Sequence, residues 1–414
     1  MKVGDYMKSL RELYKIGNGP SSSHTMGPKK AVRLFEKKHP ELDEIKVYLY
    51  GSLALTGKGH LTDAVIKNTI KSCKVDVIFD LEMECDVHPN TFDIEGYKNG
   101  QIVDKWRVYS IGGGSIKIEG EDGKDSKDVY NLKYYKDIKK YCEEKNISLY
   151  QYVLENEEED FLEFLKRAWG VMKNSVETGL VTEGIIPGKL NLDRRSKLIY
   201  ENLIENETPD MRRTRILSSY AYAVTENNAS GEEIVTAPTC GACGVVPAVL
   251  YYSYKDEKFS EEKILEALAV AGIIGNIVKE NASISGAECG CQAEVGTACS
   301  MAAAARMYLI GGTLEQIENA AEIAMEHHLG LTCDPIYGYV QIPCIERNAV
   351  AAMRAVDAAN LSKVIPSNRK ISFDVVVETM YETGKDLKEH YRETSEGGLA
   401  KKYCRNKFYN KEIE

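Results

Sequence analysis

The pattern of apolar residues changes near residue 155, and this change limits the fold more than any other feature of the chain. Two runs before it, Glu44–Gly51 and Val75–Asp80, have the composition of short strands. The helical segment between them begins at a candidate N-cap, Thr62. Asn99-Gly100 lies between two further strand-like arms, and this dipeptide is a strong signal for a β-hairpin. The first part therefore predicts a region that contains a sheet.

The second part has the pattern of packed helices. Its longest apolar stretch, Ala267–Val278, has 12 residues, which predicts a buried helix and falls short of the roughly 20 residues that cross a bilayer. Ser300–Gly312 is rich in alanine. Thr313 and Gln316 then fit a capping box at the start of another helix.

An acidic run, Glu155–Asp160, separates the two parts. A chain of 414 residues has room for two or three domains that each bury a core. We therefore expect an α+β fold, in which an N-terminal α/β sandwich-type domain (residues 1–152) is followed by an all-α domain (residues 160–408).

The charge balance argues against a nucleic-acid partner. The chain has 63 acidic and 53 basic residues and a net charge of −10, whereas phosphate binding needs a concentrated basic face. The first residues, MKVGDYMKSLRELYKIG, carry charges throughout and lack the apolar core of an export signal. We expect a cytoplasmic protein that binds a small molecule and has neither nucleic acid nor a membrane as a partner.

Seven of the eleven cysteines lie between residues 240 and 344, where an even spread would put about three. In a reducing cytosol such thiols indicate metal binding, redox chemistry or packing rather than disulfides. Four thiolates would form a closed site, whereas three would leave one iron of a cluster open to a substrate. Spacing does not choose which thiols take part, although two of them fall on predicted loops. The seven are Cys240, Cys243, Cys289, Cys291, Cys299, Cys333 and Cys344.

Two segments of the first part are candidate binding sites. Gly17–Pro28, GNGPSSSHTMGP, places hydroxyls and backbone N–H groups ahead of a helix, which suits a carboxylate, and the simpler alternative is a turn with an N-cap. Tyr50–Asp63 brings His60 and Asp63 to a helix start. A histidine beside a carboxylate suits proton transfer near neutral pH.

Seven motifs, in the same order, resemble those of the bacterial iron-sulfur L-serine dehydratases, also called L-serine ammonia-lyases. They extend from about residue 10 to residue 404. The motifs are PSSSHTMGP, YGSLALTGKGHLTD, TEGIIPG, TAPTCGACGVVPAVL, SISGAECGCQAEVGTACSMAAAA, EHHLGLTCDPIYGYVQIPCIERN and ETMYETGKDLKEHYRETSEGGLA. The resemblance implies a β domain and a helical α domain in one chain, a 4Fe-4S cluster, and β-elimination of water from L-serine to give pyruvate and ammonia.

The resemblance also assigns roles to single residues. It implies that three cysteines, Cys291, Cys333 and Cys344, hold the cluster, whose open iron would act as a Lewis acid. It makes His60 the expected base or proton shuttle, with Ser23, His24 and Thr25 in the same catalytic set. The expected substrate-binding residues are Ser21, Ser22, Thr239, Cys240, Gly241 and Ala242.

Two positions depart from the family pattern. Several relatives have asparagine in a TNGA motif, whereas Cys240 occupies that place here in TCGA, so a polar substrate contact is lost or remade. Relatives end at or just after a cysteine that caps the cluster, whereas ten residues follow Cys404 here. Cys404 is therefore a candidate for a regulatory tail that differs from that of its relatives.

Two other functions remain open at this point. One is the same elimination on L-threonine or L-cysteine, and the other is a non-catalytic sensor of metal or amino acid. A sensor would need four protein ligands, which distinguishes it from an enzyme with an open iron. The surface of the β domain is a candidate contact for a homodimer. The resemblance further implies a place in amino-acid catabolism and gluconeogenesis.

Overall fold

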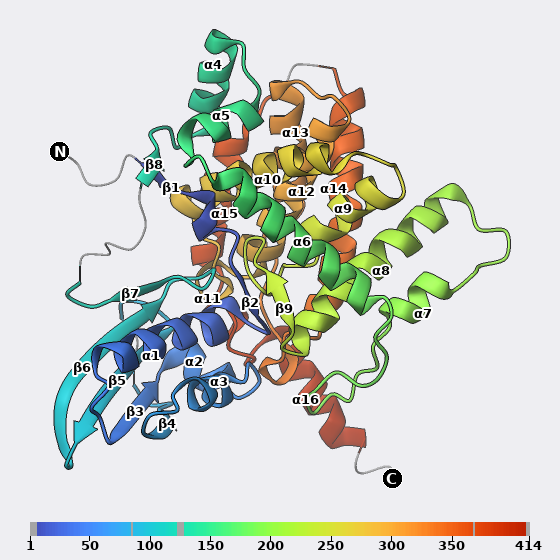
Figure 1. The fold of residues 1–414 in the computed structure, drawn as a ribbon. Helices are drawn as coiled ribbons and strands as arrows, with labels where there is room; N and C mark the ends of the chain where they lie inside the picture. Colours follow the sequence, from blue (N-terminus) through green and yellow to red (C-terminus); the bar gives the residue numbers. More distant parts are fainter. Residues whose placement is uncertain (1–5, 84–85, 122–127, 367–368, 411–414) are drawn as a thin grey trace.

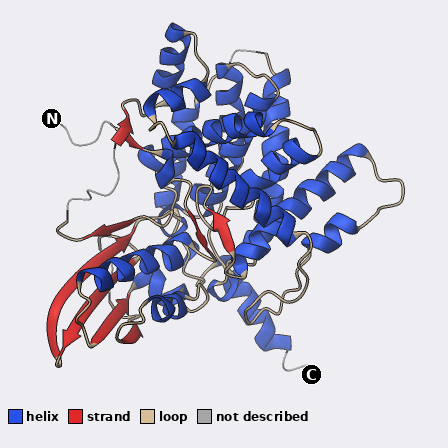
Figure 2. Cartoon of the chain, viewed as in Figure 1, coloured by secondary structure: helices blue, strands red, loops and turns tan. Residues whose placement is uncertain are grey.

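The computed structural model describes residues 6–83, 86–121, 128–366 and 369–410. The N-terminal part contains a mixed sheet and the C-terminal part is helical, which confirms the predicted α+β class (Figures 1 and 2). The sheet lies at one corner of the molecule, and the helices form the larger body beside it (Figure 1).

The N-terminal sheet has five strands in the order β4-β3-β5-β6-β7. β3 and β4 are parallel, and the other neighbours are antiparallel. The two predicted strands correspond to β3 and β4, and the predicted hairpin joins β5 to β6. Asn99 and Gly100 have φ values of 52° and 76°, the left-handed conformation that this type of tight turn requires. The bounds are β3 (Glu44–Leu49), β4 (Lys74–Phe79), β5 (Thr91–Lys98), β6 (Gln101–Ser110) and β7 (Ile116–Ile118).

Helices α1 (Gly27–Lys38) and α3 (Thr62–Thr69) pack on one face of this sheet (Figure 1). Alternate residues of β3 are buried beneath them, as in any strand with one covered face, and they form a core with Phe35 of α1. A further short helix, α2 (Gly51–Thr56), follows β3 directly. The start of α1 lies close to the C-terminal end of β3. The candidate site is at this end of the strands.

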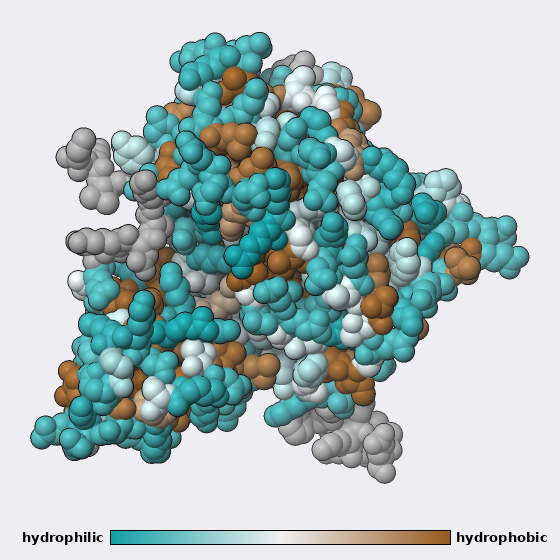
Figure 3. All heavy atoms as spheres, viewed as in Figure 1, coloured by the Kyte–Doolittle hydropathy of each residue, from teal (hydrophilic) through white to brown (hydrophobic). Residues whose placement is uncertain are grey.

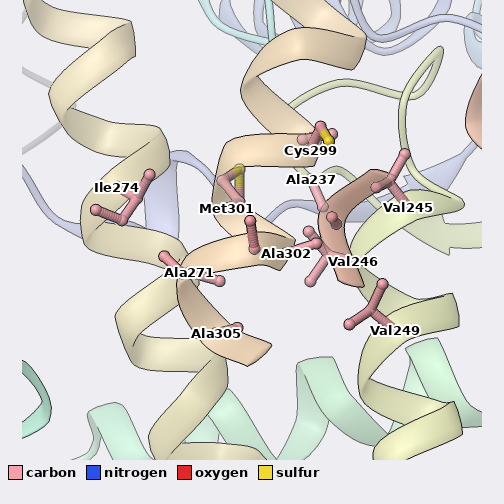
Figure 4. Packing of buried hydrophobic residues seen from close by; sticks show 14 of the residues in the cluster. Ala237, Val245, Val246, Val249, Ala271, Ile274, Cys299, Met301, Ala302 and Ala305 are labelled. Carbon is pink, nitrogen blue, oxygen red and sulfur yellow. The ribbon is translucent and has the colours of Figure 1, made fainter. Parts of the chain in front are cut away.

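The helical body is built around α10 (Glu261–Asn281) and α12 (Thr297–Leu309). The predicted apolar stretch lies within α10 and is buried. The small side chains of Ala302 and Ala305 let α12 pack closely against its neighbours (Figure 4). The predicted capping box is present at the start of α13. The remaining helices are α4 (Tyr135–Lys145), α5 (Leu149–Asn156), α6 (Phe161–Gly179), α7 (Ser196–Glu201), α8 (Pro209–Ala229), α9 (Val245–Lys255), α11 (Gly286–Cys289), α13 (Leu314–Glu326), α14 (Cys344–Val364), α15 (Phe373–Asp386) and α16 (Gly398–Asn410).

The first described residues belong to the helical core rather than to the sheet. Leu10, Leu13 and Tyr14 are buried in that core, and the Tyr14 hydroxyl donates to the carbonyl of Leu268 at 2.9 Å. Two small sheets hold this segment, one between β1 (Met7–Lys8) and β8 (Asp128–Tyr130) and one between β2 (Ile16–Asn18) and β9 (Glu233–Val235). The chain therefore begins in the helical body, then forms the sheet part, and afterwards returns to the helical body.

The predicted domain boundary falls within this helical body. Tyr152 of α5 and Phe161 of α6 lie in the same buried core. The division into residues 1–152 and 160–408 stays a prediction.

The face seen in Figure 3 is mostly hydrophilic, with apolar side chains scattered over it. Within the described ranges, no helix combines the length and the apolar character that crossing a membrane requires.

Candidate active site

A buried turn of hydroxyl side chains precedes α1. The turn η2 (Ser22–Met26) follows Ser21, whose hydroxyl accepts the backbone N–H of His24 at 3.1 Å. Ser23 Oγ lies 2.9 Å from His24 Nδ1. The simple N-cap of the sequence analysis is thus present, but its side chains face the interior of the protein. The buried residues of this turn are Ser21, Ser22, Ser23, His24 and Thr25.

Helix α2 brings two hydroxyls to the other ring nitrogen of His24. Ser52 Oγ and Thr56 Oγ1 lie 3.1 Å and 3.0 Å from His24 Nε2. Both hydroxyls donate elsewhere, Ser52 to the Glu393 carbonyl and Thr56 to the Ser52 carbonyl. They therefore accept from His24, which carries its proton on Nε2 and accepts at Nδ1.

His60 lies directly beside His24, with 4.2 Å between the ring centroids. Its Nδ1 faces the carbonyl oxygen of Thr56 at 3.1 Å, so the ring proton is on Nδ1. The hydroxyl of Thr25 donates to the backbone carbonyl of His60 at 2.9 Å and holds the two segments together. Neutral His60 is thereby left with a basic Nε2.

Glu393 is the carboxyl group beside both histidines. Its Oε1 lies 3.8 Å from His60 Nε2 and 3.6 Å from His24 Nδ1. One ligand atom from each of the three residues lies within 4.8 Å of the others, which is close enough to hold an ion between them. The expected pairing of His60 with Asp63 is not formed, because Asp63 lies in the first turn of α3 and accepts the N–H of Ala64.

Burial controls the charge of these three groups. It lowers the pKa of His24 well below its ordinary value, with His60 adding to the effect. It lowers the pKa of His60 to about 4. Burial, with the nearby Glu294 carboxyl, raises the pKa of Glu393 well above its usual range. Each group is therefore favoured in its neutral form near pH 7.

Three thiols from the helical body form a second cluster, of which Cys291 and Cys333 are buried and Cys344 is partly exposed. Cys291 precedes the turn η3 (Gln292–Gly296), Cys333 lies on the loop after α13, and Cys344 begins α14. Burial and the charges of the neighbouring thiols and carboxyls raise the pKa values of Cys333 and Cys344 well above the ordinary range. Glu393 is one of these neighbours for both thiols, so the thiol cluster adjoins the histidine cluster.

One cation stands beside the thiols. Arg347 follows Cys344 by one turn of α14 and donates to the carbonyl of Thr332 at 2.6 Å and to Asp334 at 3.3 Å. Burial raises the pKa of Cys291 to about 11, and the Arg347 guanidinium opposes this shift. The guanidinium therefore favours the thiolate form of the thiol that it faces.

A second carboxyl, that of Glu294, lies against the turn that contains Thr239–Ala242. Thr239 Oγ1 donates to Glu294 Oε1 at 2.7 Å. Burial raises the pKa of Glu294 to about 7. A Cβ on Gly286 would lie 2.6 Å from Glu294 Oε2 and 3.2 Å from Cys333 Sγ. Glycine at position 286 therefore leaves room beside the thiol.

The residues of this turn do not all face the same way. Gly241 borders Glu294, because a Cβ there would lie 3.2 Å from Oε1. Cys240 Sγ instead lies 3.5 Å from Met26 Sδ, so this substituted position packs against the end of η2. Ala242 is fully buried in the core.

Cys404 lies away from the three thiols. It is partly exposed on α16, which extends from the body toward the C-terminus (Figure 1). The side chain of Asp334 accepts the N–H of Leu399 at 2.5 Å and so fixes the start of this helix. In the described part of the chain, no contact joins Cys404 to the thiol cluster, and its regulatory role stays a prediction.

The structure thus brings the hydroxyl turn, His60, the Thr239 turn and the three predicted thiols to one junction. Sequence reasoning missed Glu393, Glu294 and Arg347. Two of these could have been found, because Glu294 and Arg347 follow Cys291 and Cys344 by three residues, about one helical turn. Glu393 lies in a loop and has no such periodic signal.

The buried His60 predicts a loss of stability in acid. The unfolded chain binds a proton at this ring near pH 6.5, whereas the folded chain does so only near pH 4. Stability is therefore full above pH 6.5 and falls by about 3 kcal/mol toward pH 4. His60→Asn, which keeps a donor for the Thr56 carbonyl, should flatten the fall in thermal midpoint between pH 7 and 5. The exposed control His327→Asn should follow the unchanged protein, and equal slopes in all three would contradict the assignment.

Comparisons with known proteins show the family to which this chain belongs. The family model described as serine dehydratase beta chain matches residues 9–74, and the one described as serine dehydratase alpha chain matches residues 118–400. L-serine dehydratase of Haemophilus influenzae is 42% identical over 97% of this chain and 100% of its own length. L-serine dehydratase 2 of Escherichia coli is 41% identical over 96% and 99%, and L-serine dehydratase of Streptomyces coelicolor is 40% identical over 95% and 98%. Both regions occur here in one polypeptide, and the chain belongs to the serine dehydratase family.

Proposed function

We propose that this protein deaminates L-serine to pyruvate and ammonia by β-elimination of water. Relatives named L-serine dehydratase match it over nearly the whole length of both chains. The observation that carries the proposal is the junction itself, where His60 of the sheet part and three thiols of the helical body meet beside Glu393. Proton transfer and metal binding are thereby available at one place.

We further propose that Cys291, Cys333 and Cys344 hold a 4Fe-4S cluster. The donor set fits, because thiolates are the usual ligands of iron-sulfur clusters. Glycine at position 286 is compatible with a group on Cys333, because a Cβ there would lie only 3.2 Å from Cys333 Sγ and would crowd it. Arg347 supplies a positive charge beside the thiols. The chemistry that such a group supplies when bound is that of a Lewis acid toward the hydroxyl and carboxylate oxygens of the substrate.

Three thiols rather than four take part in this proposal. Cys289 is two residues from Cys291, but its side chain packs on α15, where a Cβ on Gly384 would lie 2.9 Å from Cys289 Sγ. Cys299 Sγ donates to the carbonyl of Ala351 within the core. A three-thiolate site leaves a coordination position for substrate, which an enzyme needs and a structural site does not.

The proposed base is His60. Its Nδ1–H is held by the Thr56 carbonyl, so Nε2 is free to take the α-proton of serine. Glu393 Oε1, 3.8 Å away, is in position to exchange this proton, and the β-hydroxyl leaves as water once it has gained one. The resulting aminoacrylate tautomerises to an imine, which water hydrolyses to pyruvate and ammonia.

The other residues of the turn would bind and orient the substrate. His24 is held from both sides by Ser23, Ser52 and Thr56, so its ring is fixed rather than free to rotate. The hydroxyls of Ser21, Ser22 and Thr25, together with Thr239 and Gly241 of the facing turn, border the same space in this proposal. Exclusion of water there strengthens every polar contact with the substrate.

The proposed ligand set predicts which cysteine substitutions remove iron from the protein. Protein purified without oxygen should contain iron and sulfide, absorb visible light and form pyruvate from L-serine. Cys333→Ser, Cys291→Ser and Cys344→Ser should each lose iron and activity. Cys73→Ser, in the sheet part, should keep both. A colourless protein that contains zinc and does not act on serine would refute the proposal.

The proposed base predicts a loss of turnover without a loss of metal. His60→Ala should lower kcat by about 10²- to 10⁴-fold, the usual contribution of a general base, while iron content and visible absorption stay unchanged. Glu393→Gln keeps the shape of the side chain but cannot exchange a proton, so kcat should fall with KM for serine nearly unchanged. The exposed control His327→Ala should behave as the parent protein, and full turnover in His60→Ala would exclude His60 as the base.

A further inference from the structure

Asn90, the residue before β5, is a buried amide with an unusual lack of partners. Its side chain is 0% exposed, and neither Oδ1 nor Nδ2 has a hydrogen-bond partner among the residues that the structure describes. Its backbone is well bonded, because its N–H donates to His88 Nδ1 at 3.0 Å and its carbonyl accepts the N–H of Ser110 at 2.9 Å. Buried amides without partners are rare, and a ligand is one way to complete their hydrogen bonds.

The register of the sheet shows which way this amide points. Asn90 lies opposite Ser110, one step beyond the pair formed by Thr91 and Tyr109. Side chains of directly opposed residues lie on the same face of a sheet. The Ser110 hydroxyl donates to the carbonyl of Ser23 at 2.7 Å, so this face carries the turn η2. The Asn90 side chain is therefore directed toward η2.

Helix α2 also connects the backbone next to Asn90 with the turn that holds His24. The N–H of Ser52 donates to the carbonyl of Pro89 at 2.9 Å, next to Asn90 in the chain. The hydroxyl of Ser52 contacts His24 Nε2. The backbone at Pro89 and Asn90 is thus hydrogen-bonded to two serines that both contact the turn holding His24, so the Asn90 amide lies on the side of the sheet that carries the histidine cluster.

We propose that Asn90 binds the amino-acid part of the substrate, with Oδ1 accepting from the α-ammonium group and Nδ2 donating to the α-carboxylate. An amide offers an acceptor and donors, which match the two charged groups of an amino acid. This inference rests on the proposed function and adds a residue that recognises the class of substrate rather than the reacting hydroxyl.

The test compares L-serine with L-alanine, which has the same ammonium and carboxylate groups but no hydroxyl to eliminate. Asn90→Ala should raise KM for serine and the inhibition constant of alanine by the same factor, about 10- to 100-fold, because hydrogen bonds to charged groups are lost. Iron content should stay unchanged. Asn90→Asp keeps the acceptor but loses both donors and should also weaken both ligands.

A matched control is Asn276→Ala, since Asn276 is equally buried but donates to the carbonyl of Lys8 in the helical body. It should leave both constants unchanged. A rise in KM with an unchanged alanine constant would overturn the proposal, and so would two unchanged constants. If Asn90→Ala does not fold, Asn90→Ser gives the same comparison in a similar space.

The proposed function can fail separately from this inference. Parent protein without serine turnover would contradict the function, but binding of L-alanine could still be measured as a rise in thermal midpoint. Under the inference this rise is present in the parent protein and in Asn276→Ala, and is lost in Asn90→Ala. An equal rise in all three would contradict a role of Asn90 in binding the amino acid.

Discussion

The junction depends on two backbone hydrogen bonds that join the thiol loop to the segment containing Glu393. The N–H of Cys333 donates to the carbonyl of Tyr391, and the N–H of Glu393 donates to the carbonyl of Cys333, both at 2.8 Å. The carbonyl of Glu393 then accepts the hydroxyl of Ser52, which contacts His24. A continuous chain of hydrogen bonds therefore runs from a proposed cluster ligand to the histidines. Because these hydrogen bonds are short, the fold fixes the distance between the proposed cluster ligand and the two histidines.

Burial gives this junction its chemical character. Water is excluded from His24, His60 and Glu393, so their neutral forms are favoured and His60 keeps a free basic nitrogen at neutral pH. Two of the thiols, Cys291 and Cys333, are buried as well, but Arg347 provides a charge that favours the thiolate of Cys291. One side of the junction is thus suited to proton transfer and the other to metal binding. The two histidines come from the sheet part and the three thiols from the helical body, so the junction forms only where the two parts meet.

Local signals predicted much of the fold. The Asn99-Gly100 turn, the capping box at Thr313 and the buried stretch within α10 depend on residues close in sequence, and all three are present. Contacts between distant segments could not be predicted in this way. Glu393 lies near His60 although more than 300 residues separate them in the sequence. Asp63 is closer to His60 in the sequence, but it accepts a hydrogen bond within α3 instead of pairing with His60. The sequence places Cys333 and Cys344 on predicted loops, and Cys333 does lie on the loop after α13, whereas Cys344 is the first residue of α14.

Iron-57 Mössbauer spectroscopy of the protein purified without oxygen tests the central claim most directly, that three thiols hold a cluster with one position open beside His60 and Glu393. Spectra are recorded before and after addition of L-serine to the His60→Ala protein, in which the substrate is not consumed. The account predicts one iron environment that differs from the others and changes alone when serine binds. Iron environments that are all alike and unaffected by serine would contradict it.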